Sequence, residues 1–202
     1  MHTTLRTGRS ARRLAALCLV GAVALGACSN PASSGSSQSV TPGGAEVNPA
    51  GDIPDNQVFV AYTDPSGAFT VKVPEGWASS EAGGAVTYTD KLNSIRIESS
   101  STPAAPTVAS VTAELPTIAS SRPGYVAGDV TEVTRSAGPG VLATYEGDAA
   151  ADPVTGKVVH DAFERYEFWH AGELVVLTLS GPVGADNVDP WKIVTDSLTW
   201  PA

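Results

Sequence analysis

A chain of 202 residues has room for one ordinary domain and short appendages. Its 12 basic and 21 acidic residues give a formal net charge of −9, which disfavours binding to the phosphate backbone of nucleic acids. With only two cysteines the chain cannot build a disulfide framework or a thiolate metal site, and we expect no metal and no cofactor.

The first 27 residues have the pattern of a bacterial lipoprotein signal peptide. Residues 1–13 carry four arginines and no acid, and residues 14–27 are a run of apolar and small side chains. A helix needs roughly 20 such residues to span a bilayer, so the run fits a signal-peptide core. It ends in Leu25-Gly26-Ala27-Cys28, which predicts cleavage between Ala27 and Cys28. An ordinary secretory signal or an uncleaved anchor would leave this ending unexplained.

Cys28 is the predicted lipidation site, carrying S-diacylglycerol on its sulfur and an acyl chain such as palmitate on its new N-terminus. Removal of residues 1–27 takes away four of the 12 basic residues and no acid, so the net charge becomes −13. The expected location is the outer face of the cytoplasmic membrane, with the bilayer as a partner through Cys28. Export by the general or the twin-arginine route stays open.

Residues 28–56 are predicted to be the lipidated cysteine and a disordered tether. The segment is rich in Ser, Gly and Pro and has almost no large apolar side chains, so it cannot bury enough surface to offset its conformational entropy. A single folded domain, expected to be a monomer, is predicted over residues 57–202.

The first half of this domain reads as strands followed by a helix. Residues 58–62, 69–73, 86–89 and 94–98 are the expected strands, and residues 90–93 are the hairpin turn between the last two. Val108, Val111, Leu115 and Ile118 then form one apolar stripe at helical spacing. Pro106 suits the first turn of this helix, and Pro116 is expected to kink or end it.

The second half returns to strands and closes with a helix. The expected strands are residues 130–135 with a bulge, 141–146, 157–170, and 174–179, the last being a continuous apolar run typical of a central strand. In the final helix, Asp189 is the predicted N-cap, Pro190 the first helical residue, and Val188 with Ile193 a hydrophobic staple. The fold class that follows is α+β, a mostly antiparallel sheet of seven or eight strands with helices packed on it.

Two stretches carry a family resemblance. Residues 69–77 are a strand ending in Pro-x-Gly-Trp, and residues 193–200 close the domain with the sequence IVTDSLTW. Over roughly residues 58–200 the chain resembles the PsbP-like α/β/α sandwich and the LpqN-type lipoproteins of high-GC Gram-positive bacteria. The resemblance implies a non-catalytic protein that binds partners or lipidic ligands. No ligand residue of these families can be matched to a position here.

The histidines and acids give no clear catalytic or metal pattern. His160 and His170 are ten residues apart on one expected strand, about 33 Å, which is too far to share a metal ion. The chain has no Gly-x-Ser-x-Gly sequence of a serine hydrolase. Two sets of acids flank the loop at 147–156 and the last helix, and neither matches an EF-hand, although loosely bound calcium stays an alternative. These acids are Asp148, Asp152, Asp161, Asp186 and Asp189.

Four tryptophans are many for a domain of this size. Most are expected in the core, and some could line a groove between sheet and helix that suits an apolar or amphipathic ligand. They are Trp77, Trp169, Trp191 and Trp200. We therefore expect a non-catalytic, membrane-anchored accessory protein of the cell envelope that binds a lipid, glycolipid or protein partner. The alternatives are a scaffolding module without a pocket and, more remotely, a hydrolase.

Overall fold

The computed structural model describes residues 49–152 and 154–201. Cys28, the predicted cleavage site after Ala27 and the predicted tether up to residue 48 lie outside the described residues. No helix in the described part is long and apolar enough to cross a membrane.

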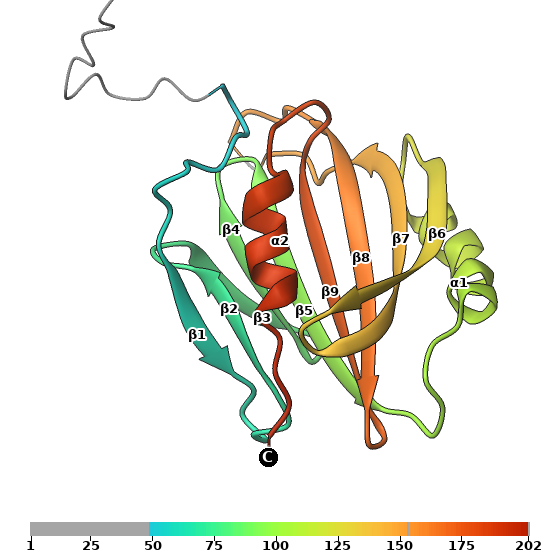
Figure 1. Ribbon diagram of the computed structural model, residues 1–202. Coiled ribbons are helices and arrows are strands. Elements are labelled where there is room, and N and C mark those ends of the chain that lie inside the picture. Colours follow the sequence, from blue (N-terminus) through green and yellow to red (C-terminus); the bar gives the residue numbers. More distant parts are fainter. Residues whose placement is uncertain (1–48, 153, 202) are drawn as a thin grey trace, which may run out of the picture. The chain divides into compact units, whose positions relative to one another are not determined.

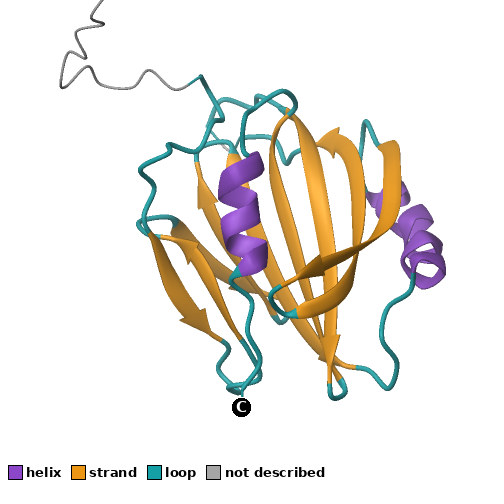
Figure 2. Ribbon diagram, viewed as in Figure 1, coloured by secondary structure: helices purple, strands orange, loops and turns teal. Residues whose placement is uncertain are grey.

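A seven-stranded antiparallel sheet forms the centre of the domain, in the order β3-β4-β5-β9-β8-β7-β6. Helix α2 and the hairpin β1-β2 lie on one face of this sheet, and helix α1 lies on the other (Figure 1). Helices at both faces of one sheet are also evident in Figure 2. This architecture confirms the predicted α+β class. The elements are β1 (Phe59–Thr63), β2 (Thr70–Pro74), β3 (Ala78–Ala82), β4 (Ala85–Asp90), β5 (Asn93–Ser101), α1 (Val108–Ser121), β6 (Val126–Arg135), β7 (Gly138–Asp148), β8 (His160–His170), β9 (Glu173–Pro182) and α2 (Val188–Asp196).

The main core lies between the sheet and the layer made by β2 and α2. Strand β2 buries alternate residues against the sheet, as its apolar–polar alternation predicts. The predicted apolar face of the last helix is also confirmed, because Trp191, Val194 and Leu198 are buried there. Strand β9 is the fourth of seven strands, which confirms the central position predicted from its apolar run.

A smaller core lies under α1 on the opposite face. Val111 is fully buried against Val141 and Ala143 of β7, with Val108 and Leu115 packed beside it. The apolar stripe predicted for this helix is thus the surface that contacts the sheet. Strand β6 has a bulge, but its register shifts between Ala127 and Val130, before the stretch 130–135 in which the bulge was predicted.

Strand β3 was not predicted. All five of its residues are exposed, so its sequence ASSEA has neither apolar alternation nor an apolar run. It pairs with β4 through a two-residue turn at Gly83 and Gly84, whose φ angles of 60° and 80° favour glycine. The pairing depends on this backbone turn and not on burial.

Pro106 does not lie in the first turn of α1 as predicted, because the helix begins two residues later at Val108, and Pro116 does not end the helix. Thr107 is the N-cap and forms a reciprocal capping box with Ser110, so Pro106 precedes the helix. Beyond Pro116 the helix continues to Ser121 because Ile118 extends the half-buried stripe.

The predicted cap and staple of α2 are wrong. The N-cap is Asn187, which places Asp189 and Pro190 inside the first turn. Val188 and Ile193 are 69% and 45% exposed and form no staple. Asn187 is buried and directs its side chain towards residues that precede the sheet, as described next.

The packed domain begins before residue 57, in contrast to the predicted boundary. Ile53 is only 4% exposed and belongs to the main core. The carbonyl oxygen of Gly51 accepts hydrogen bonds from the side-chain amides of Asn93 and Asn187, both at 2.9 Å. Residues 51–53 are therefore part of the fold, although their composition resembles that of the predicted tether.

Candidate ligand-binding site

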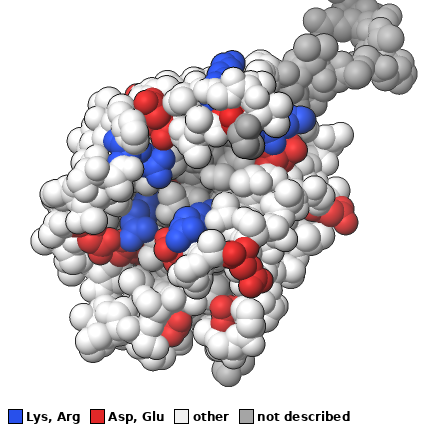
Figure 3. Space-filling view, turned by 180° about the vertical axis from the view of Figure 1, so that it is seen from behind, with Lys and Arg blue, Asp and Glu red and all other residues white. Residues whose placement is uncertain are grey.

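A hollow of about 470 Å³ lies on the face of the sheet opposite α2, near the β4–β5 turn. We call it the back pocket. Its floor comes from β4, β5, β8 and β9, and its walls from the β7–β8 loop and from the segment after α1. Figure 3 views this side of the molecule, where Lys and Arg side chains gather around a hollow in the surface. The lining residues used below are Ser94, Arg122, Asp161, Phe163 and Ser180.

The floor is built by sheet register. Phe163 of β8 pairs with Ser180 of β9, which in turn pairs with Ser94 of β5, so the three side chains lie in one row across the strands. The hydroxyls of Ser94 and Ser180 are 2.8 Å apart and hydrogen-bonded. The floor therefore combines an aromatic ring with a pair of hydroxyls that can both donate and accept.

Asp161 is the buried acid of the pocket. It is only 3% exposed, and its Oδ1 has no hydrogen-bond partner in the protein. Burial raises the pKa of this carboxyl to about 6, because loss of solvent outweighs the opposing effects of Arg122, His160 and the Ser180 hydroxyl. A buried carboxylate oxygen without a partner is a strong acceptor for a ligand that donates a hydrogen bond.

Arg122 forms the opposite wall. Its guanidinium lies 4.1 Å from the centre of the Phe163 ring, a cation–π contact, and its Nη1 donates to the carbonyl oxygen of Asp148 at 3.3 Å. The aliphatic stem crosses β7 at Gly147, where a Cβ would lie 2.5 Å from Arg122 Cδ. Nε of the same guanidinium is buried and has no hydrogen-bond partner. The side chain is thus fixed, with its buried Nε–H donor unused.

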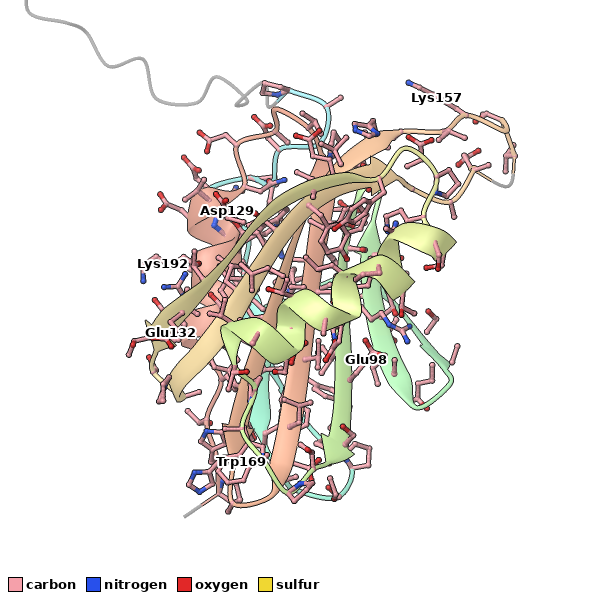
Figure 4. The ribbon with its side chains drawn as sticks, turned by 90° about the vertical axis from the view of Figure 1, so that its right-hand side faces the viewer. Glu98, Asp129, Glu132, Lys157, Trp169 and Lys192 are labelled. Atoms are coloured by element: carbon pink, nitrogen blue, oxygen red, sulfur yellow. The ribbon has the colours of Figure 1, made fainter. Side chains whose placement is uncertain are left out.

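A second charged cluster lies farther along the same face and connects α1 to the sheet. Arg165 of β8 contacts Glu114 of α1 at 2.9 Å and Glu167 at 2.8 Å. Glu98 completes the cluster from β5, and Figure 4 shows its position near α1. Burial raises the pKa of Glu167, Arg165 opposes this shift, and the neighbouring Glu114 adds to it. Arg165 Nε and Glu167 Oε1 are buried without a hydrogen-bond partner, but the ion pairs join α1 to the sheet, and we regard the cluster as structural.

The two predicted histidine positions lie at opposite ends of β8 and have separate surroundings. His160 contacts Asp148 through Nδ1 at 2.9 Å and Glu146 through Nε2 at 3.3 Å. Its pKa is raised, chiefly by the hydrogen bond to Asp148. His170 instead stacks on Trp200, with 5.3 Å between the ring centres.

The five acids singled out in the sequence do not converge. Asp152 accepts bonds from Val154 and Thr155 in its own turn, which lowers its pKa. Asp148 binds His160, and Asp161 lies in the back pocket. Asp186 donates its backbone N–H to Asp52, and Asp189 lies in the first turn of α2. Among the described residues no group of three or more His, Cys, Asp or Glu side chains is placed to hold a metal ion.

Three of the four tryptophans pack in or against the main core, as expected for most of them, and the fourth lines a hollow between the sheet and the start of a helix. Trp191 is buried between α2 and the sheet, with Trp77 and Trp200 packed at the edge of that core. Trp169 lies near the lower end of the sheet in Figure 4 and donates from Nε1 to the carbonyl oxygen of Thr102. It lines a separate hollow of about 700 Å³ between β6, β7 and the start of α1.

Sequence reasoning named Asp161 only as a loop acid and missed Arg122, Ser94 and Ser180. A local signal existed for Arg122, since Arg122-Pro123-Gly124 ends the helix. No local signal existed for the serines, because their pairing is a property of strands that are 86 residues apart in the chain.

No family model matches the chain, and no curated protein matches it. Among solved structures, a Bacteroides thetaiotaomicron protein is similar at TM-score 0.48 and 14% identity over 70% of this chain, which spans about half, 48%, of that protein. The cyanobacterial PsbP protein CyanoP of Synechocystis is similar at TM-score 0.47 and 16% identity, covering 79% of this chain and 98% of CyanoP. LpqN of Mycobacterium tuberculosis, a protein involved in cell envelope biogenesis, is similar at TM-score 0.43 and 17% identity, covering 73% and 93%.

Proposed function

We propose that this chain is a lipid-anchored, extracytoplasmic accessory protein that binds a lipid, glycolipid or protein partner of the cell envelope without altering it chemically. The anchor is Cys28, after cleavage behind Ala27. The back pocket is the binding site. The single observation that carries the binding function is the buried Asp161, whose Oδ1 has no partner in the protein and which lines that pocket.

The pocket favours a polar part of a ligand over an acyl chain. Its volume of about 470 Å³ is within the ordinary range for ligand sites, roughly 300–1,000 Å³. Its inner wall, however, consists of a carboxylate, a guanidinium and hydroxyls beside one aromatic ring. The core between the sheet and α2 is filled by side chains such as Phe168 and Leu177. These features support a head group as the bound moiety.

A hydrolase is the second candidate, favoured by the raised pKa of Asp161 inside a hollow. Against it, His160 directs its two ring nitrogens to Asp148 and Glu146 and is not part of the pocket lining. Ser180 is hydrogen-bonded to Ser94, so neither hydroxyl has a histidine base. The arrangement resembles a binding site more than a catalytic one.

Co-purification tests the binding function. The mature protein is extracted from membranes of its own host in mild detergent, and bound lipids are identified by mass spectrometry against an extract lacking the protein. We expect an enriched envelope lipid that is reduced in a Phe163→Ala variant and retained in Glu132→Gln, a change on β6 outside the back pocket. Equal lipid content in the wild-type protein, the Phe163→Ala variant and the extract lacking the protein would contradict the lipid form of the proposal.

The anchor has its own test. Cys28→Ala is expected to block processing or release the protein from membranes, measured by fractionation and intact mass. Cys18→Ala, within the predicted signal core, is the matched control and is expected to leave both unchanged. Unchanged size and membrane retention of Cys28→Ala would contradict the lipoprotein prediction.

A further inference from the structure

Two buried polar atoms of the back pocket lack a hydrogen-bond partner, and one is an acceptor while the other is a donor. Asp161 Oδ1 is an acceptor without a donor, and Arg122 Nε–H is a donor without an acceptor. Both residues line the same hollow. They do not satisfy each other, since none of the ion pairs among the described residues joins Asp161 to Arg122. Leaving each group unpaired costs about 1–3 kcal/mol, so the pair marks a place where a ligand gains binding energy.

The two groups are held apart by their own contacts. The guanidinium is fixed over Phe163 and by the carbonyl oxygen of Asp148, while its stem lies on Gly147. Asp161 is buried in β8 between the strands β7 and β9, beside Ser180. Because both positions are set by the sheet and by the end of α1, the two groups are preorganised for a ligand.

We propose that the inner end of the back pocket binds a zwitterion, with a primary ammonium on the Asp161 carboxylate and a carboxylate or phosphate on the Arg122 guanidinium. This inference rests on the proposed binding function and names the chemistry of its ligand. An ammonium donates to Oδ1 and also compensates the buried negative charge. A planar guanidinium edge is suited to carboxylate and phosphate oxygens.

Ligands with only one of these charges fit less well. A simple cation leaves the buried Nε–H of Arg122 without an acceptor, and a simple anion faces the carboxylate of Asp161. A neutral hydroxyl satisfies both hydrogen bonds but leaves the carboxylate without a compensating charge. The groups that act on Asp161 from its surroundings are Arg122, His160 and Ser180, and together they do not offset its burial.

Such a zwitterion can be a free amino acid or the head group of an aminophospholipid. The volume of the pocket exceeds that of a small amino acid, and its remaining lining from β4 and the β7–β8 loop leaves room for a larger molecule. The experiment therefore has one arm for each source.

In the first arm, binding of alanine, lactate and isopropylamine to the full mature chain is measured by NMR titration. Lactate replaces the ammonium of alanine by a hydroxyl, and isopropylamine replaces its carboxylate by a methyl group. Alanine is expected to bind at least about tenfold more tightly than either control, since each control leaves one buried group unpaired. Asp161→Asn is expected to abolish the preference for alanine over lactate, and Arg122→Gln the preference for alanine over isopropylamine. Glu132→Gln is the control variant, and backbone spectra establish that each variant is folded.

In the second arm, vesicles with phosphatidylethanolamine are compared with vesicles of phosphatidylglycerol in a co-sedimentation assay with the unlipidated chain. Retention on the ethanolamine vesicles alone, lost in Asp161→Asn, identifies a lipid source, while binding of alanine alone identifies a free ligand. Equal affinity for lactate and alanine, or no preference in either arm, overturns the inference. An enriched lipid without an ammonium group would leave the binding function standing and refute the zwitterion. Alanine binding without any co-purifying lipid would support the zwitterion site and refute the lipid form of the proposed function.

Discussion

The side chain of Asn187 accepts a 2.8 Å hydrogen bond from the backbone N–H of Ile53, and so ties the start of α2 to the start of the domain. Its Nδ2 donates to the carbonyl oxygen of Gly51 and to Asn93 Oδ1. Gly181 makes room for this network, because a Cβ there would lie 2.4 Å from Asn93 Oδ1. Three segments that are distant in sequence therefore share one buried asparagine.

Asn187→Ala is expected to lower the free energy of unfolding by about 2–3 kcal/mol. The substitution leaves the buried N–H of Ile53 without its partner and removes one donor to Gly51. Urea denaturation measures the change. Asn56→Ala, at an exposed position, is the matched control and should stay within about 0.5 kcal/mol of the wild type. A similar small effect for Asn187→Ala would show that the network is not stabilising.

Arg165→Met is expected to destabilise the domain by about 3 kcal/mol. Glu167 is only 1% exposed, and without Arg165 it would be a buried carboxylate beside Glu114. Adding Glu167→Gln should recover at least about half of the loss, because it removes the uncompensated charge. Arg96→Met, which breaks the more exposed pair with Glu98, should cost less than about 1 kcal/mol. Equal losses for the two arginine variants would contradict this account of the cluster.

The raised pKa of Asp161 predicts how the stability of the domain changes with pH. Its pKa is about 6 in the folded chain against an ordinary value of 3.8, so the folded state binds the proton more tightly. The contribution to stability is therefore fully present below pH 3.8 and is lost as the pH rises through about 6. The loss is about 3 kcal/mol at most.

Comparison of the wild type with Asp161→Asn isolates this contribution from other carboxylates. The variant is expected to be more stable than the wild type near pH 7, and the difference should vanish towards about pH 4. Urea denaturation across this range measures it. A difference that is constant with pH would mean that the carboxyl of Asp161 is not perturbed by folding.

His160 is expected to titrate above its ordinary pKa of 6.5 because of its hydrogen bond to Asp148. Asp148→Asn should therefore lower the pKa of His160, and Glu146→Gln should lower it less, since the bond to Asp148 is the larger cause. NMR titration of the imidazole protons follows both variants. A larger effect of Glu146→Gln would reverse the assigned order of the two acids.

Much of the fold could be predicted because its signals are local. Val71 and Val73 alternate with polar neighbours, the stripe through Val111 repeats at helical spacing, and the apolar run of β9 marks a strand buried on both faces. Strand β3 and the cap at Asn187 had no such signal. The first depends on a glycine turn, and the second on partners far away in the sequence.

The sequence by itself determined the charge balance, the strand and helix patterns, and the prediction of a lipid anchor at Cys28, because each rests on neighbouring residues. Only the tertiary structure decided that Gly51 and Ile53 belong to the domain and that Arg122 and Asp161 line one pocket. The physical reason is that sheet register joins strands that are distant in the chain, and burial then sets which polar groups go without a partner.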